Sequence, residues 1–341
     1  LCIGATMCGA SQDATSNSRI SMTWQDPTNA SAKGDCEGMS FGTSTLGIED
    51  PSCGEGIIIR STIDLAQTAL QYLDINSAWG VPFPVPIVNQ FRYGALVLQG
   101  ASPELVSLVF TDTNTSSVLA TELAQPRFTG GTYVVGNDQQ SGVTGNAVQI
   151  YGGGTGSIPI VFEDADFIST DRGCRNQDNG RSAVWVEESF AEFINVNVLS
   201  GDFGISYRSS AGKVSNSILN VNCNGIDING MISVGSKEYP TNVTGNTITT
   251  AEGTPITAYA GSLAEIHDNT VSGSSGGSGI AVQSSRATIH GNTIGPIAGW
   301  NGLWLIGSFD VDAQNNTISD IAREPVMAGD YWTGDNPDVR R

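Results

Sequence analysis

Positive charge is what this sequence has least of. The 341 residues carry 15 Lys and Arg against 34 Asp and Glu, a formal net charge of −19. A nucleic-acid partner would need its phosphates neutralised by basic side chains, so we predict no nucleic-acid binding. Binding of a polyanionic sugar is also disfavoured unless a local basic patch or bound cations assist it.

Long apolar runs are missing as well. Stretches such as residues 54–59 and 94–98 are far too short to cross a bilayer, so we predict no membrane span. No targeting segment is visible at Leu1, and we expect a mature or excised segment. Charged residues make up only 14% of the sequence. Glycines number 42, which suits a fold with a tight turn several times per repeat.

The six cysteines contain no Cys-x-x-Cys pair, which argues against a zinc site. Their even number, with four of them before residue 54, favours disulfides formed in an oxidising compartment. We therefore expect a secreted protein that is extracellular or bound to the cell surface, and the Asn-x-Ser/Thr triplets fit that setting. The sequence does not fix the connectivity, but the pairing we favour is Cys36–Cys53 and Cys174–Cys223, which leaves Cys2–Cys8. The triplets begin at Asn29, Asn114, Asn242 and Asn315.

A short apolar strand pattern recurs along the second half of the chain. The interval between its copies is nearly constant, except for one longer interval that contains an insertion around residues 237–240. Within each copy apolar and polar residues alternate, which is typical of a β-strand. The copies begin at Ala183, Gly204, Gly225, Pro255, Gly279, Gly302 and Pro325.

A second series, with the pattern x-Asn-Thr-Ile/Val, runs in step with the first. Its asparagines, Asn246, Asn269, Asn292 and Asn316, recur at the same interval as the strand copies. Two strand series at one period indicate a solenoid with at least two strands per coil, stacked roughly 4.8 Å apart. We predict that these asparagines form a structural column, because Asn tolerates left-handed turns and its amide can bond to the amides above and below.

These repeats resemble those of the right-handed parallel β-helix proteins in the pectate-lyase-like superfamily, over roughly residues 90–330. The resemblance implies an all-β solenoid and carries almost no information about activity. In the lyases of that superfamily an Arg or Lys acts as base beside acidic residues that bind calcium. We expect no required cofactor here and keep calcium as an alternative.

The predicted organisation has four parts. Residues 1–60 form an irregular, disulfide-stapled segment, and residues 61–90 a capping helix and linker. The β-helix covers residues 91–330, and residues 331–341 are a tail. The helix is expected at residues 61–73, where Ser61 and Asp64 have capping-box spacing and the apolar residues share a face. No C-terminal cap is evident, which raises the alternative of end-to-end self-association.

Strand alternation assigns one strip of outward side chains to the first strand series. Aromatic rings interleaved with amides and carboxylates suit a neutral polysaccharide or glycan, because rings stack on sugar faces and amides bond hydroxyls. If the protein is an enzyme, we expect Glu187, Asp227 and Arg208 to be catalytic. The carboxylates lie two coils apart, about 9.6 Å, near the spacing of inverting glycosidases. The binding candidates on this strip are Trp185, Asn229, Tyr259, Gln283 and Trp304.

The two histidines, His267 and His290, are one repeat interval apart and should stack on adjacent coils. With Asp312, which like Glu265 lies two positions before the histidine register, they are a candidate metal site. The alternative is a surface ladder that merely follows the repeat, which we favour.

The one basic cluster is a third candidate. Arg172, Arg175 and Arg181 lie near Cys174, beside Asp171 and Asp178. The cluster matches no lyase motif, and the signatures of the hydrolase and esterase branches are absent too. The sequence therefore leaves two hypotheses: an extracellular structural or adhesive β-helix that binds glycans along one face, or a polysaccharide hydrolase or lyase.

Overall fold

The computed structural model describes residues 182–329 except 201–202 and 309. Before them it describes 94–100, 102, 104–111, 116–121, 123–135, 146–169 and Cys174. Ahead of residue 94 it describes seven strands, β1 to β7, by their backbone. Within these residues every regular element is a β-strand, which confirms the predicted all-β class. No helix in this part of the chain is long and apolar enough to cross a membrane.

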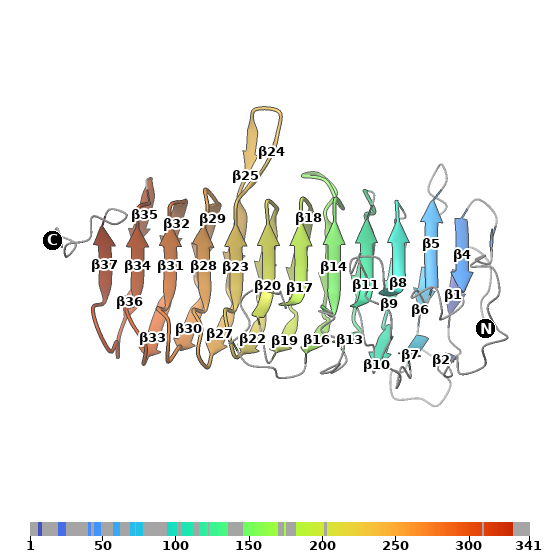
Figure 1. Ribbon diagram of the computed structural model, residues 1–341, viewed down its shortest axis with the longest axis horizontal. Helices are drawn as coiled ribbons and strands as arrows, with labels where there is room; N and C mark the ends of the chain where they lie inside the picture. Colours follow the sequence, from blue (N-terminus) through green and yellow to red (C-terminus); the bar gives the residue numbers. More distant parts are fainter. Residues whose placement is uncertain are drawn as a thin grey trace, which may run out of the picture.

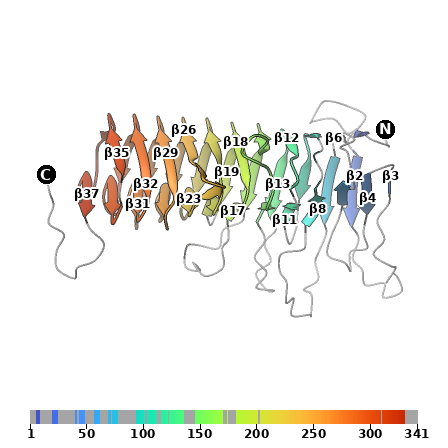
Figure 2. The ribbon, with the colours of Figure 1, turned by 90° about the horizontal axis from the view of Figure 1, so that it is seen from above.

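The strands stack into three long sheets, and each coil from β8 onward gives one strand to each sheet in turn (Figures 1 and 2). Sheet A contains β1 (Thr6–Cys8), β6 (Ala69–Gln71), β9 (Glu104–Val106), β12 (Arg127–Thr129), β15 (Ile160–Glu163), β18 (Phe190–Ile194), β21 (Ala211–Ser215), β26 (Thr241–Thr244), β29 (Leu263–His267), β32 (Arg286–His290) and β35 (Val311–Gln314). Sheet B contains β2 (Ile20–Trp24), β7 (Leu73–Ser77), β10 (Val109–Thr111), β13 (Thr132–Val135), β16 (Asp166–Ser169), β19 (Asn197–Ser200), β22 (Ile218–Val221), β27 (Thr247–Thr250), β30 (Thr270–Gly273), β33 (Thr293–Ile297) and β36 (Thr317–Ile318).

Sheet C contains the first strand series found in the sequence. Its strands are β3 (Ser40–Phe41), β4 (Ser44–Ile48), β5 (Ile57–Ser61), β8 (Gly94–Gln99), β11 (Ser116–Thr121), β14 (Val148–Tyr151), β17 (Ser182–Glu187), β20 (Phe203–Arg208), β23 (Ile226–Asn229), β28 (Ile256–Tyr259), β31 (Ile280–Gln283), β34 (Leu303–Ile306) and β37 (Val326–Gly329). Apart from β3, β4 and β5, which pair antiparallel with one another, its strands pair in parallel. Sheet A contributes a third strand to each coil, where the repeats predicted at least two.

The insertion in the longest coil is a hairpin. Strands β24 (Ile232–Val234) and β25 (Lys237–Tyr239) pair antiparallel between β23 of sheet C and β26 of sheet A. The hairpin projects beyond the ends of the sheet C strands (Figure 1).

The interior is filled by side chains that repeat from coil to coil. Toward the N-terminal end of the described solenoid the filling is aromatic: the rings of Phe128 and Phe162 stack 4.0 Å apart, and Phe193 lies 5.5 Å from Phe162. Toward the C-terminal end isoleucine and valine take over, including the completely buried Ile266 and Ile289. These residues alternate with outward polar residues along each strand, as the sequence predicted.

The predicted asparagine column is confirmed. The Asn246 amide nitrogen bonds to Asn269 Oδ1 at 2.9 Å, and Asn269 bonds to Asn292, and Asn292 to Asn316, in the same way. Asn246, Asn269 and Asn292 are almost completely buried. The left-handed turn falls one residue earlier, at Gly245 and Asp268 for example, so the ladder rather than the turn explains the repeated asparagine.

The predicted helix over residues 61–73 is wrong where the structure describes that range. Strand β5 ends at Ser61, β6 occupies Ala69–Gln71, and β7 begins at Leu73. Strand β6 pairs in parallel with β1 and β9, so Ala69–Gln71 form a strand of sheet A instead of part of a helix. Residues 62–68 lie outside the described part of the chain, and the predicted boundaries at residues 60, 90 and 330 stay predictions.

Candidate functional site

The outward side chains of sheet C form the strip that the alternation predicted. Two columns run along it, one residue per coil. The first contains Trp185, Ser206, Asp227, Thr257, Ala281 and Trp304. The second contains Tyr151, Glu187, Arg208, Asn229, Tyr259 and Gln283. We call these two columns the sheet C strip.

Arg208 is the centre of the strip. Its guanidinium carbon lies 5.1 Å from the centre of the Trp185 ring and 5.6 Å from that of Tyr259, both within cation–π range. Its Nη2 lies 2.8 Å from Asp227 Oδ2, and Nη1 donates a hydrogen bond to the Tyr259 hydroxyl. Two rings and one carboxylate therefore fix the position of the guanidinium.

Asp227 is the buried anchor of this arrangement, with 2% of its surface exposed. One carboxylate oxygen accepts a hydrogen bond from the Thr257 hydroxyl, and the other accepts one from Tyr259 at 3.0 Å. The Asn224 side chain lies 3.5 Å from Oδ1, at the limit of a hydrogen bond. A buried carboxylate is tolerated when it is paired and hydrogen-bonded in this way.

Glu187 is held by a different set of partners. The indole nitrogen of Trp185 donates a hydrogen bond to its Oε2 at 2.9 Å. Tyr151 is its neighbour on the preceding coil, and burial, followed by the negative charge of Glu187, raises the pKa of the Tyr151 hydroxyl. Burial and then the charge of Asp227 likewise raise the pKa of Tyr259 to about 12. Both phenols are therefore neutral hydrogen-bond donors at ordinary pH.

The proposed carboxylate pair does not have the spacing that the sequence suggested. Two coils on from Glu187, its column reaches Asn229, whereas Asp227 belongs to the other column. The pair is therefore diagonal, and its backbone separation is about 12 Å rather than about 9.6 Å. Asp227 is also occupied by Arg208 and Tyr259.

The hairpin borders the end of the strip at which the sheet C strands finish. The Tyr239 ring packs edge-on against Phe190, 5.0 Å away, and next to Gly156 in the turn after β14. On the other side, Glu238 forms an ion pair with Arg286 at 2.6 Å. The hairpin therefore contacts coils that precede its own coil and a coil that follows it.

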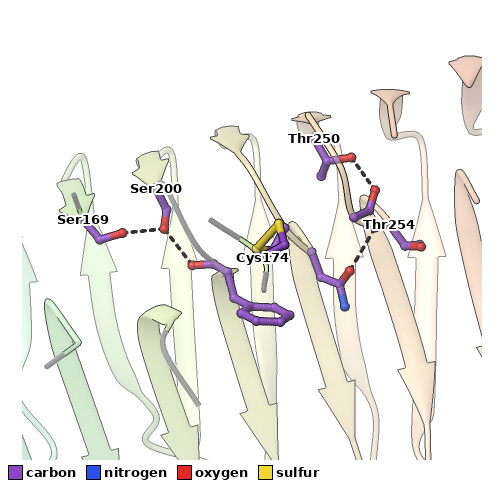
Figure 3. Close-up of a disulfide and its surroundings, with 9 residues drawn as sticks. Ser169, Cys174, Ser200, Thr250 and Thr254 are labelled. Carbon is purple, nitrogen blue, oxygen red and sulfur yellow. Dashed lines mark hydrogen bonds between the residues drawn. A yellow bond between two sulfur atoms is a disulfide. The ribbon is translucent and has the colours of Figure 1, made fainter. Parts of the chain in front are cut away.

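A disulfide borders the opposite edge, where the sheet C strands begin (Figure 3). Cys174 and Cys223 are bonded, with Cα atoms 5.3 Å apart, as we predicted. The bridge joins the turn after β16 to the turn after β22, two coils on. Residue Asn224, beside Cys223, accepts the Thr254 backbone N–H and reaches toward Asp227.

The histidines stack on adjacent coils, as predicted. His267 and His290 are register partners with ring centres 6.2 Å apart, and His290 Nε2 lies 3.5 Å from Asp312 Oδ2. Glu265 and Asp312 share the neighbouring column of sheet A with Thr288. No group of three or more His, Cys, Asp or Glu with a metal-binding arrangement is found in the described part of the chain.

Several predicted features cannot be placed. The disulfides Cys36–Cys53 and Cys2–Cys8 lie outside the described side chains, although Cys8 belongs to strand β1. Arg172, Arg175, Arg181, Asp171 and Asp178 also lie outside the described residues, as do Asn29 and Asn114.

The structure also adds residues that the sequence reasoning missed. Tyr151 joins the strip one coil before Glu187, and its strand could have been found by extending the apolar repeat backward to Val148–Tyr151. Thr257 is a hydrogen-bond partner of Asp227. Trp300 lies in a turn, outside both strand series, so no strand pattern identified it.

Comparison with known families agrees with this architecture. Residues 182–329 match the family model described as a right-handed β-helix region. No curated protein and no solved structure matches the chain.

Proposed function

Residues 182–329 form a right-handed β-helix, and we propose that its sheet C strip binds a neutral glycan on an extracellular structural or adhesive protein. The observation that carries the proposal is the row of half-buried rings on the strip, Trp185, Tyr259 and Trp304, the first two of which are held in place by Arg208. Aromatic faces next to fixed hydrogen-bond donors are what a sugar ring requires. Because the donors are already held in place, binding costs little ordering of side chains.

Charge favours an uncharged ligand. The whole chain carries a net charge of −19, and the guanidinium of Arg208 is already paired with Asp227. The strip therefore offers no surplus positive charge to hold a polyanionic sugar. Neutral hydroxyls suit the side-chain amide of Asn229 better, because it can both donate and accept hydrogen bonds.

Binding is better supported than hydrolysis. A glycosidase of the inverting type needs two accessible carboxyl groups about 6.5–9.5 Å apart. Asp227 is buried and fully engaged, and it is diagonal to Glu187. The alternative of an inverting glycoside hydrolase therefore lacks its acid–base pair on this strip.

An extracellular setting is supported by the Cys174–Cys223 disulfide, since disulfides persist in oxidising compartments. A structural role is supported by the solenoid itself, whose last described coil exposes Val326 to 44%. An exposed apolar side chain on this coil is a contact against which another copy can pack.

The test is glycan binding by the purified protein, measured by affinity electrophoresis in gels containing neutral glucans, mannans or xylans. We expect retardation by at least one neutral polysaccharide and none by polygalacturonate. Trp185→Ala should weaken binding about tenfold, because aromatic anchors carry much of the binding free energy. Leu199→Ala is the matched control, since Leu199 is 59% exposed on the outer face of sheet B.

Two results would overturn the proposal. One is the absence of binding to every neutral polysaccharide. The other is release of reducing sugar or unsaturated products that Glu187→Gln abolishes, which would establish the enzyme instead.

A further inference from the structure

A second aromatic cluster lies toward the C-terminal end of the same face. The rings of Trp300 and Trp304 are nearly perpendicular, with centres 6.1 Å apart, and the guanidinium carbon of Arg323 lies 5.6 Å from the Trp300 ring centre. Trp300 is 41% exposed, so these two neighbours leave much of its ring open. Nothing in the proposed function so far uses this exposed ring.

The backbone holds this cluster firmly. The Trp300 N–H donates to the Gly277 carbonyl at 2.8 Å, and the Trp300 carbonyl accepts the Arg323 N–H at 3.1 Å. The turn is therefore tied to the coil before it and the coil after it. An exposed tryptophan on a fixed turn is a preorganised contact.

The cluster is aligned with the Arg208 site. Trp304 and Trp185 occupy one column, separated by Ser206, Asp227, Thr257 and Ala281. Five coil rises separate the two tryptophans, about 24 Å along the solenoid axis. Between Asp227 and Trp304 this column contains only the small side chains of Thr257 and Ala281. Because Ala281 is only 7% exposed, a ligand above this stretch contacts Thr257 and the half-buried side chains of the second column, Tyr259 and Gln283.

Resting on the proposed function, we propose that Trp300 and Trp304 form a second glycan-binding platform, and that the ligand is an oligosaccharide lying along the solenoid axis. One sugar ring is far shorter than the distance between the platforms, so only a chain of several units reaches both. The chain should be neutral and β-linked, because such units present flat apolar faces to aromatic rings. Contact at both platforms couples two weak sites into one stronger site.

The experiment is calorimetric titration with β-1,4-linked glucose and mannose oligosaccharides of two and of six units. For the wild type we expect the six-unit chain to bind at least about tenfold more tightly than the two-unit chain. Trp300→Ala should remove most of that gain and change the affinity for the two-unit chain less than about twofold. Trp300→Tyr, which keeps a flat ring, should retain most of the gain, and Leu199→Ala should retain all of it.

The outcomes separate the two proposals. Equal affinities for both chain lengths in the wild type, or an unchanged six-unit affinity in Trp300→Ala with its unfolding midpoint unaltered, would overturn the second platform alone. Binding that responds to Trp300 but not to Trp185 would place the site at the C-terminal end and contradict the bridging chain. If neither oligosaccharide nor any neutral polysaccharide binds the wild type, the proposed function itself falls.

Discussion

Asp227 is the residue on which the arrangement of the sheet C strip depends. Removing its carboxylate would leave the guanidinium of Arg208, 23% exposed, without its ion-pair partner and would leave two hydroxyls without their acceptor. We expect Asp227→Ala to lower the free energy of unfolding by about 3 kcal/mol, the low end for breaking a buried ion pair, because Arg208 is partly solvated. Urea unfolding followed by tryptophan fluorescence measures this loss.

The matched control is Asn229→Ala, a change on the same strand at a less buried outward position. It should alter the free energy of unfolding by no more than about 0.5 kcal/mol. Equal effects of the two substitutions would show that Asp227 is an ordinary surface residue.

Tyr259 makes the strip sensitive to alkaline pH. Its pKa in the folded protein is raised to about 12 from 10.0, so the unfolded chain loses this proton first as the pH rises. The stability that Tyr259 contributes is therefore fully present below about pH 10 and is lost as the pH rises toward about 12. We expect Tyr259→Phe to show a shallower fall of the unfolding midpoint across this range than the wild type.

The comparison is made by thermal unfolding at a series of pH values. The other buried tyrosines titrate in both proteins and cancel in the difference. Parallel curves for the wild type and Tyr259→Phe would contradict the contacts assigned to this hydroxyl.

At the residue scale the sequence predicted which side chains face outward but not which ones pair. Alternation alone placed Trp185, Asp227 and Tyr259 on one face, and all three lie there. Which side chains contact each other depends on the column that each residue occupies. Glu187 lies two residues further along its strand than the residue that shares a column with Asp227, so the two carboxylates are in different columns. Asp227 and Thr257 are register partners. Because the insertion lengthens the coil between them, their sequence separation differs from the repeat interval and did not identify them as neighbours.

Among the structural elements, the asparagine ladder makes the clearest quantitative prediction. Asn269 is buried, donates to Asn292 Oδ1 and to the carbonyl of Val243, and accepts the backbone N–H and side-chain amide of Asn246. We expect Asn269→Ala to lower the free energy of unfolding by about 2–3 kcal/mol, because several buried polar groups lose their partners at once. Thr270→Ala, at the exposed neighbouring position, should cost less than about 0.5 kcal/mol.

Hydrogen exchange gives a second measure of the same substitution. The backbone N–H of Asn246 should exchange faster in Asn269→Ala, because it loses its acceptor. If Asn269→Ala cost no more than the exposed Thr270→Ala, the ladder would contribute little to stability.

The elements predicted best were those whose pattern repeats. Strands of sheet C and the turns that lead into sheet B recur at a near-constant period, so each copy supports the others. The hairpin was recognised only as an insertion, because a single copy has no repeat to define it. The segment at residues 61–73 was misread for a related reason: its apolar residues fit a helix face, but parallel pairing with neighbouring coils decides the structure of Ala69–Gln71 and Leu73–Ser77.

At the scale of the whole molecule, long-range ties supplement the contacts between adjacent coils. In a solenoid each coil contacts mainly its two neighbours, so stability is close to a sum of local terms. The Cys174–Cys223 bridge has a sequence separation of 49, and the Glu238–Arg286 ion pair one of 48. Both flank the sheet C strip, one at each edge, so these two ties connect coils in the part of the solenoid that is proposed to bind glycan.

The central claim is that a neutral glycan lies along the outer face of sheet C. A crystal structure of the protein with the six-unit oligosaccharide that binds best in the titration tests it most directly. We expect the sugar chain parallel to the solenoid axis, with rings stacked on Trp185 near one end and on Trp304 or Trp300 near the other. A sugar chain on sheet A or sheet B, or one crossing sheet C along its strands, would contradict the claim.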